Sequence, residues 1–212
     1  MTETTGSRAE RKERTRQAIL DATLELCADV PLAALSLRQV AKQVGIVPTA
    51  FYRHFDSIEQ LGLALVDDSF GSLRAMLNDL RTNTDPQFGS LIDSSLATMA
   101  DHVRRQHDHF AFITRERFAG PPAVRDAINA NLTRFVDELA TDIARVPAVR
   151  SWSTDDLRTL ADLIVTTFVT TAERLIGTAP GSAAEREVAD AARTQVRMLI
   201  IGARQWDSSR RR

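Results

Sequence analysis

Basic side chains are grouped in one short stretch of the chain, residues 36–54. This stretch contains Arg38, Lys42 and Arg53 and no acidic residue, although the whole chain of 212 residues has a formal net charge of −1. Guanidinium and ammonium groups bind phosphate oxygens, and a local surplus of them is the electrostatic signature of a nucleic-acid-binding surface. We therefore expect this stretch to contact the phosphate backbone of DNA.

The same stretch has the pattern of two short helices joined by a glycine turn. Ser36 stands where a helix N-cap is expected, Gly45 supplies the positive φ that reverses the chain, and Pro48 suits the first turn of a second helix. The apolar residues at helical spacing are expected to hold the two helices together; they are Val40, Ala41, Val44, Phe51 and Phe55. The pattern predicts a helix-turn-helix, whose second helix enters the major groove of double-stranded DNA.

The side chains outside these packed faces are the predicted DNA contacts. Thr49, Ala50 and Arg53 lie toward the groove-facing side of the second helix, where methyl, hydroxyl and guanidinium groups recognise base edges. Tyr52 and His54 are expected to donate hydrogen bonds to phosphate oxygens, which fixes the register without selecting a sequence. The complete predicted set is Ser36, Arg38, Lys42, Pro48, Thr49, Ala50, Tyr52, Arg53 and His54.

A second basic segment precedes the helix-turn-helix. Residues 8–16 include five basic and two acidic residues. Such a segment is either an arm that reaches DNA or a solvated tail with paired charges, and we expect it to contact DNA. Residues 1–56 together form the predicted arm and DNA-binding domain.

Helical patterns predominate along the whole chain, and no run of alternating apolar and polar residues is long enough to predict a strand. The spacing predicts an all-α fold of about nine helices, with three in the head. A linker helix over residues 57–80 begins at a capping box of Ser57 and Gln60. Breaks at proline, glycine and aspartate delimit further helices at 87–106, 109–118, 122–145, 153–176 and 183–207. Residues 57–212 form the predicted second domain, to which we assign dimerisation and, as the family resemblance given below implies, effector binding.

The last two predicted helices have apolar stripes too wide for one partner. We expect the helices at 153–176 and 183–207 to form a four-helix bundle between two copies of the chain. The residues predicted to lie in this dimer interface are Val165, Val169, Val196 and Leu199. A homodimer places two helix-turn-helix heads on two half-sites, so the DNA partner is expected to be a palindromic operator.

Composition excludes a membrane protein. Apolar residues make up 43% of the chain and charged residues 26%, which are ordinary globular proportions. The most apolar segment, 160–176, is interrupted by Asp162, Glu173 and Arg174, so it is not expected to span a membrane. Because the first residues are polar and resemble no secretory signal, we expect a cytoplasmic protein.

No catalytic or metal-binding residues are predicted. The sequence has neither a glycine-rich phosphate loop nor a nucleophile elbow, so an enzyme is not expected. His102, His107 and His109 include no pair at i, i+4 and have no cysteine near them, which favours surface residues over a metal site. Cys27 lies among apolar residues and is expected to be an inert buried thiol.

The helix-turn-helix resembles that of the TetR family of transcription regulators. The segment Tyr52-Arg53-His54-Phe55 matches the Tyr-x-His-Phe ending typical of that family, and the resemblance extends over residues 12–66. It implies a DNA-binding regulator, most simply a repressor, that responds to a small molecule. The chain departs from the family at Val47, where a capping serine is frequent, and at Ser57 or Ile58, where a phosphate-binding lysine is frequent.

Within the family, three segments resemble regulators of fatty-acid synthesis: residues 45–55, 59–67 and 115–118. This resemblance implies an acyl-CoA or acyl-ACP effector and no cofactor. The residues expected to wall an apolar tunnel are Met99, Val103, Phe110, Ile113, Phe135, Ile164 and Phe168, with Arg104, Arg105, Arg115 and Arg117 near its ends as partners for carrier phosphates. The same apolar residues are also compatible with an ordinary core. The alternatives are a repressor of efflux or catabolic genes that senses another hydrophobic ligand, and a helical protein-interaction module.

Overall fold

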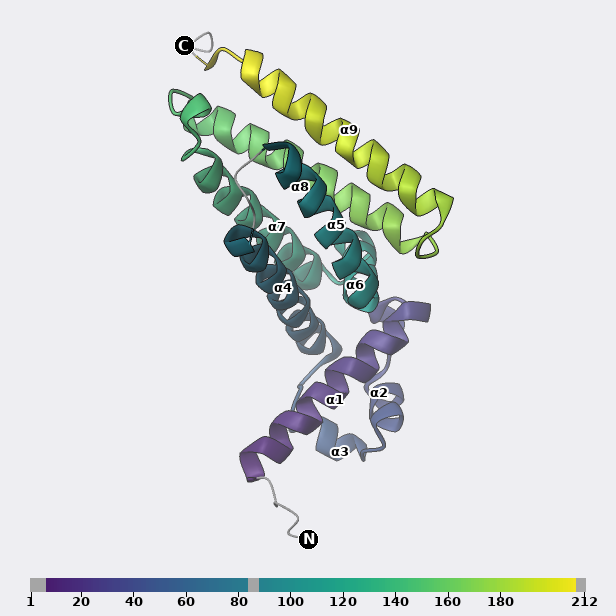
Figure 1. Cartoon of the computed structure of the whole chain (residues 1–212). Coiled ribbons are helices and arrows are strands. Elements are labelled where there is room, and N and C mark those ends of the chain that lie inside the picture. The colour runs from purple at the N-terminus through teal and green to yellow at the C-terminus, as the bar shows by residue number, and fades with distance from the viewer. Residues whose placement is uncertain (1–6, 84–87, 209–212) are drawn as a thin grey trace. The chain divides into compact units, whose positions relative to one another are not determined.

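The structure of the chain, a computed structural model, describes residues 7–83 and 88–208, with side chains outside 76–93 (Figure 1). Within these residues the chain forms nine α-helices, two short 3-10 helices and no strand, as the helical spacing predicts. The elements are α1 (Arg8–Asp29), η1 (Leu32–Ala34), α2 (Leu37–Val44), α3 (Pro48–Phe51), α4 (Ile58–Asn83), α5 (Phe88–Arg105), α6 (His107–Ala119), α7 (Pro122–Ile143), η2 (Pro147–Val149), α8 (Thr154–Ile176) and α9 (Ala183–Gln205).

The basic segment at residues 8–16 is not an extended arm but the first part of α1. Helix α1 begins at a capping box in which the Ser7 hydroxyl accepts a hydrogen bond from the Glu10 N–H at 3.3 Å and the Glu10 carboxylate accepts one from the Ser7 N–H at 2.7 Å. The two bonds satisfy donors that a helix start leaves unpaired, so the helix extends to its most polar residues. The prediction of an arm is therefore wrong, while its contact with DNA stays a prediction.

The chain contains two compact units that do not follow the predicted boundary after residue 56. The first unit comprises residues up to Gly71 together with Ala111–Ile128, and the second comprises Ser72–Phe110 and Asn129–Arg212. Helices α4, α6 and α7 therefore each have residues in both units. The assignment of DNA binding to residues 1–56, and of effector binding and dimerisation to 57–212, concerns function and stays a prediction.

The core of the first unit joins the helix-turn-helix to α1 and to the start of α4. Its fully buried side chains include Ile19, Leu32, Val40, Phe51, Phe55, Leu61 and Leu65. Val40, Phe51 and Phe55 are the residues that the spacing predicts at the interface between the two helices of the motif. Their burial confirms the predicted packing.

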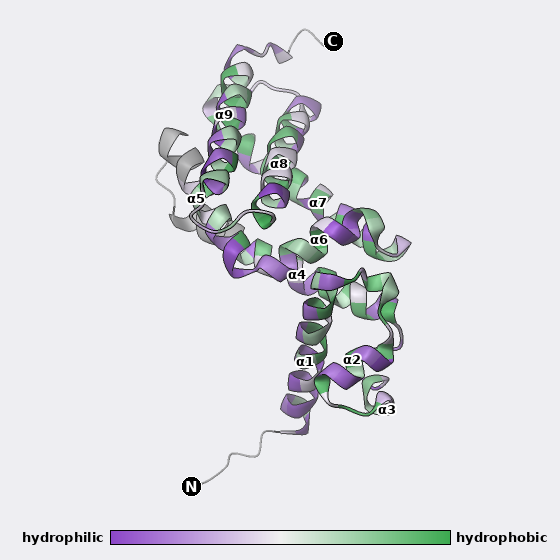
Figure 2. Cartoon of the chain, turned by 90° about the vertical axis from the view of Figure 1, so that its right-hand side faces the viewer, coloured by the Kyte–Doolittle hydropathy of each residue, from purple (hydrophilic) through white to green (hydrophobic). Residues whose placement is uncertain are grey.

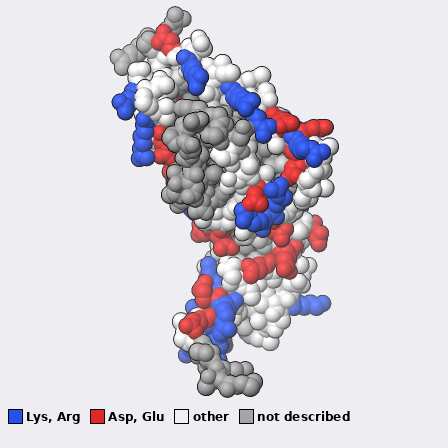
Figure 3. Space-filling view, viewed as in Figure 1, with Lys and Arg blue, Asp and Glu red and all other residues white. Residues whose placement is uncertain are grey.

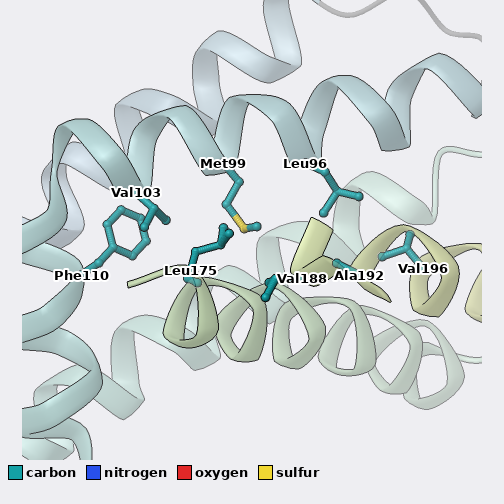
Figure 4. Close-up of a cluster of buried hydrophobic side chains, with 9 residues drawn as sticks. Leu96, Met99, Val103, Phe110, Leu175, Val188, Ala192 and Val196 are labelled. Carbon is teal, nitrogen blue, oxygen red and sulfur yellow. The ribbon is translucent and has the colours of Figure 1, made fainter. Parts of the chain in front are cut away.

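The core of the second unit is an apolar cluster contributed mainly by α5, α8 and α9. It consists of Leu96, Met99, Val103, Phe110, Ala172, Leu175, Val188, Ala192 and Val196. The side chains follow one another from Phe110 and Val103 at one end to Leu96 and Val196 at the other (Figure 4). Helices α8 and α9 also carry many hydrophilic residues along their lengths, as expected of amphipathic helices (Figure 2). No helix of the described chain is both long and apolar enough to cross a membrane.

Candidate nucleic-acid interface

Helix α2 is bounded on both sides by the devices that the sequence predicts. The Ser36 hydroxyl accepts a hydrogen bond from the Gln39 N–H at 3.3 Å, and the Gln39 side chain accepts one from the Ser36 N–H at 2.8 Å. The helix ends at Gly45, whose φ of 75° and ψ of 28° place it in the left-handed region. A side chain at that φ is sterically unfavourable, which explains why glycine forms the turn. The turn thus directs the chain from α2 into α3.

Helix α3 is a single turn, Pro48–Phe51, followed by hydrogen-bonded turns through His54. Pro48 occupies the first helical position, where its missing N–H costs no hydrogen bond. The chain stays coiled after Phe51, because the N–H groups of His54 and Phe55 donate to the Phe51 carbonyl at 2.8 and 3.2 Å. The segment from Pro48 to Phe55 is therefore one compact recognition element.

Aromatic packing fixes this recognition element against α1. Phe51 and Phe55 are buried, with ring centroids 5.9 Å apart. On α1, the Arg16 guanidinium lies 4.5 Å from the centroid of the Phe55 ring, a cation-π contact. This contact brings a basic residue of α1 beside the motif, which the sequence alone did not predict.

The predicted DNA contacts are mostly exposed. Ala50 and His54 are half-buried. The other seven residues are exposed: Ser36, Arg38, Lys42, Pro48, Thr49, Tyr52 and Arg53. The Tyr52 side chain is 55% exposed, with its ring edge against Phe51 at 6.2 Å between centroids. The exposed phenol and guanidinium groups are thus carried on a rigid aromatic base. Contact with DNA itself stays a prediction for every residue of the set.

His54 lies in a positive environment. Burial lowers its pKa, and the nearby charges of Lys12, Arg16 and Arg53 lower it further, against the opposing effect of Glu13. The ring Nδ1 of His54 is buried and neither accepts nor donates a hydrogen bond. His54 is therefore neutral at pH 7, and the three surrounding cations supply the charge that attracts phosphate. Lys and Arg side chains lie beside Asp and Glu side chains in the N-terminal part of the surface (Figure 3).

The predicted effector-binding residues fall into separate groups. Met99, Val103 and Phe110 belong to the apolar cluster of the second unit, and Phe168 packs against it. Phe135 is buried and Ile164 half-buried in the same unit, but neither belongs to that cluster. Ile113 belongs to the first unit, so the structure does not bring it into the cluster. A ligand tunnel through these residues stays a prediction.

The arginines expected to bind carrier phosphates already interact within the protein. Arg104 pairs with Glu185, and Arg105 pairs with Asp101. The Arg117 guanidinium lies 5.0 Å from the centroid of the Phe118 ring.

Arg115 and Glu116 of α6 instead hold the end of α1 and the start of η1. The Arg115 guanidinium donates to the Cys27 carbonyl and, at 2.8 Å, to the Ala28 carbonyl. Glu116 is fully buried, and its Oε1 accepts a hydrogen bond from the Leu32 N–H at 3.0 Å. Arg115 therefore has a structural role, and its contact with a carrier phosphate stays a prediction. We name this pair and its three backbone partners the α6 clamp.

The thiol next to the α6 clamp is buried, as predicted. Burial raises the pKa of Cys27 to about 12, with a further increase from the neighbouring Glu116 and an opposing effect of Arg115. A thiol with this pKa is protonated at neutral pH and is a poor nucleophile.

The predicted dimer residues have unequal exposure. Val165, Val169 and Leu199 are half-buried, whereas Val196 is 5% exposed and belongs to the apolar cluster of its own subunit. The Val196 side chain is therefore already covered within its own subunit, and its place in a dimer interface stays a prediction. Other large apolar side chains of this region are exposed. They are Leu163 on α8, Met198 and Ile201 on α9, and Trp206 at the C-cap of α9.

Comparisons with known proteins extend over both parts of the chain. The family model of bacterial regulatory proteins of the tetR family matches residues 19–65, and the model of the tetracyclin repressor-like C-terminal domain matches residues 88–202.

Solved structures also match most of the chain. A transcriptional regulator from Rhodococcus sp. RHA1 is 19% identical with a TM-score of 0.68, and the match covers 88% of this chain and 96% of that one. A regulator from Pseudomonas aeruginosa PAO1 is 15% identical with a TM-score of 0.70, and the match covers 91% of this chain and 93% of that one. A third is AibR in complex with isovaleryl coenzyme A and operator DNA (16%, 0.64, 86% and 97%). At these identities the matches show a shared fold.

Proposed function

Because the chain belongs to the TetR family and is a DNA-binding transcription regulator, not an enzyme, we propose that it is a repressor whose operator affinity is controlled by a long-chain acyl-CoA. The family resemblance expected from the segment Tyr52–Phe55 is confirmed. The subgroup of fatty-acid regulators, and hence the control of lipid-metabolism genes, is the part that we propose.

The observation that carries the DNA-binding part is the helix-turn-helix with its exposed side chains. Arg38, Lys42 and Arg53 present positive charge, and Tyr52 presents a hydroxyl, on elements fixed by a buried aromatic core. Because packing already fixes the backbone that carries these groups, phosphate binding orders only their side chains. We infer that α3 enters the major groove, with phosphate contacts on both sides of it.

The effector part rests on the apolar cluster of the second unit. Met99, Val103, Phe110 and Phe168 come together there, and methionine and aromatic side chains adapt to alkyl chains of different lengths. AibR, which shares the fold, binds isovaleryl coenzyme A together with operator DNA. We propose an acyl group among these four side chains, with Phe168 at the edge of the cluster as the first to move.

Two copies of the chain are proposed to associate through α8 and α9. Met198 and Ile201 on α9 are 67% and 63% exposed, and Leu163 on α8 is 46% exposed. Covering such side chains with a second copy removes apolar surface from water, which stabilises the dimer. The dimer sets the spacing of the two DNA-binding heads. A ligand that binds more tightly at one head spacing than at another therefore changes operator affinity, and operator DNA changes ligand affinity by the same factor.

The test is a titration of acyl-CoAs of increasing chain length into the protein bound to a fluorescent operator, which is first selected from random duplexes. We expect a response that grows with chain length, and Phe168→Trp and Phe110→Trp variants that bind operator normally but respond less. Phe118→Trp is the matched control, because Phe118 is 69% exposed and lies outside the cluster. If free coenzyme A acts as strongly as the long-chain thioesters, the apolar cluster is not the sensor. If no thioester acts, the effector is another hydrophobic ligand.

A further inference from the structure

Val47 stands at the N-cap of α3 with a side chain that serves no visible purpose in the fold. It is 64% exposed and makes no capping hydrogen bond, since it has no polar atom. Its backbone is extended, with φ of −71° and ψ of 145°, which is the ordinary N-cap conformation. The position therefore has the geometry of a cap but lacks a capping group.

This residue type is unfavourable at this position on local grounds. Serine, threonine, aspartate and asparagine are the preferred N-cap residues, and valine is among the least suitable. Burial does not compensate, because most of the side chain is in water. Helices α1, α2, α8 and α9 begin at a serine whose hydroxyl caps the helix, namely Ser7, Ser36, Ser153 and Ser182. Helices α3 and η2 instead begin at a valine that is followed by proline and makes no capping bond, Val47-Pro48 and Val146-Pro147. The Val47 side chain therefore gives α3 no stabilisation of this kind.

The neighbours of Val47 indicate what its exposed side chain contacts. Pro48 and Thr49 follow it directly and are exposed, and Arg53 is exposed on the next turn. The N-terminal residues of a recognition helix are those that contact base edges in the major groove. An isopropyl group cannot donate or accept a hydrogen bond, and the one apolar group that the major groove displays is the C5-methyl of thymine.

We propose that Val47 is a specificity-determining residue that packs against a thymine methyl group and so selects an A·T pair at one symmetric position in each half-site of the operator. The inference rests on DNA binding through α3. It adds Val47 to the predicted set, in which Thr49 and Ala50 are also expected to bring methyl groups to base edges. The chain gives up a helix cap at Val47 in exchange for base selectivity.

The experiment replaces each thymine of the selected operator by uracil, which differs only by the missing C5-methyl. Wild-type protein, Val47→Ala and Val146→Ala are titrated with each duplex. Val146 precedes Pro147 at the N-cap of η2, as Val47 precedes Pro48, and it lies outside the predicted DNA contacts. We expect uracil at one position of the half-site to weaken wild-type binding about fourfold for each methyl group removed, the effect of exposing one methyl-sized apolar group. Val47→Ala should be indifferent to uracil at that position, and Val146→Ala should keep the wild-type sensitivity there.

A stability measurement separates this role from a structural one. Val47→Ser should raise the melting temperature by about 2–4 °C, because it restores the cap, and at the same time weaken operator binding. The inference is overturned if no uracil substitution affects wild-type binding, or if Val47→Ala keeps the wild-type sensitivity. If the wild type selects no duplex at all, the DNA-binding function fails first, and this inference fails with it.

Discussion

Replacing Arg115 by methionine should destabilise the protein by about 2 kcal/mol through loss of one side of the α6 clamp. The guanidinium donates to two carbonyls, those of Cys27 and Ala28. A hydrogen bond from a charged donor contributes about 1.5–3 kcal/mol when buried, and less when water reaches it. One of these bonds is partly buried and the other is exposed, so we take the lower end for the first and about 0.5 kcal/mol for the second. Methionine keeps most of the apolar stem, which limits the additional loss of packing.

Urea-induced unfolding, followed by circular dichroism at one fixed protein concentration, measures this difference. The concentration must be equal for all variants because dimer formation shifts apparent stability. The shift of the urea midpoint, multiplied by an unchanged m-value, gives the change in the free energy of unfolding. A changed m-value would indicate a change in the unfolding mechanism.

Arg117→Met is the matched control on the same helix. Its guanidinium lies over Phe118, which is 69% exposed, and exposed cation-π contacts contribute about 0.5–1 kcal/mol. We therefore expect Arg117→Met to cost no more than half as much as Arg115→Met. Equal destabilisation by the two variants, or an Arg115→Met variant within about 0.5 kcal/mol of wild type, would refute the structural role of the clamp.

Three further outcomes are expected. Arg53→Ala should cost about 1–3 kcal/mol of operator affinity and relax sequence preference, whereas Tyr52→Phe should weaken binding to all duplexes alike. Titrating each variant with operator and with random duplexes tests both expectations. Ile201→Glu should convert dimers to monomers in sedimentation experiments, whereas Phe118→Glu should not, although both side chains are more than 60% exposed. Because burial and neighbouring cations lower the pKa of His54 below its ordinary value of about 6.5, the stability that it contributes is complete above that pH and is lost as the pH falls toward the lowered value. His54→Gln should therefore lose less melting temperature than wild type on acidification, and an identical pH profile would contradict this.

The helices and the helix-turn-helix were predictable because their determinants are local. Ser36, Gly45 and Pro48 act within a few residues of the helix ends that they define, so their types alone locate those ends. The start of α1 was equally accessible, since Ser7 and Glu10 have capping-box spacing, but the charge of the following residues suggested an arm that contacts DNA instead.

The tertiary contacts were not predictable for two physical reasons. First, Glu116 and Leu32 are 84 residues apart in the sequence. Second, Arg115 and Glu116 of α6 bind backbone atoms, and residue types do not indicate which backbone atoms will be bound. In α9, an apolar stripe indicates that a face is covered but not whether its own subunit or a partner covers it. Val196 and Ile201 are both apolar residues of α9, and only their exposed fractions, 5% and 63%, distinguish them.

The division of the chain into two units has a consequence for building chimeric regulators. Exchanging residues 1–56 between relatives would move the DNA-contacting side chains but leave Ala111–Ile128, which belongs to the same compact unit, in the recipient. The donor's α1 and η1 would then meet a foreign α6 at Cys27, Ala28 and Leu32, where an arginine and a glutamate are needed. A transferable head of this protein is therefore discontinuous in sequence: residues up to Gly71 must be transplanted together with Ala111–Ile128 for the new specificity to arrive on an intact fold.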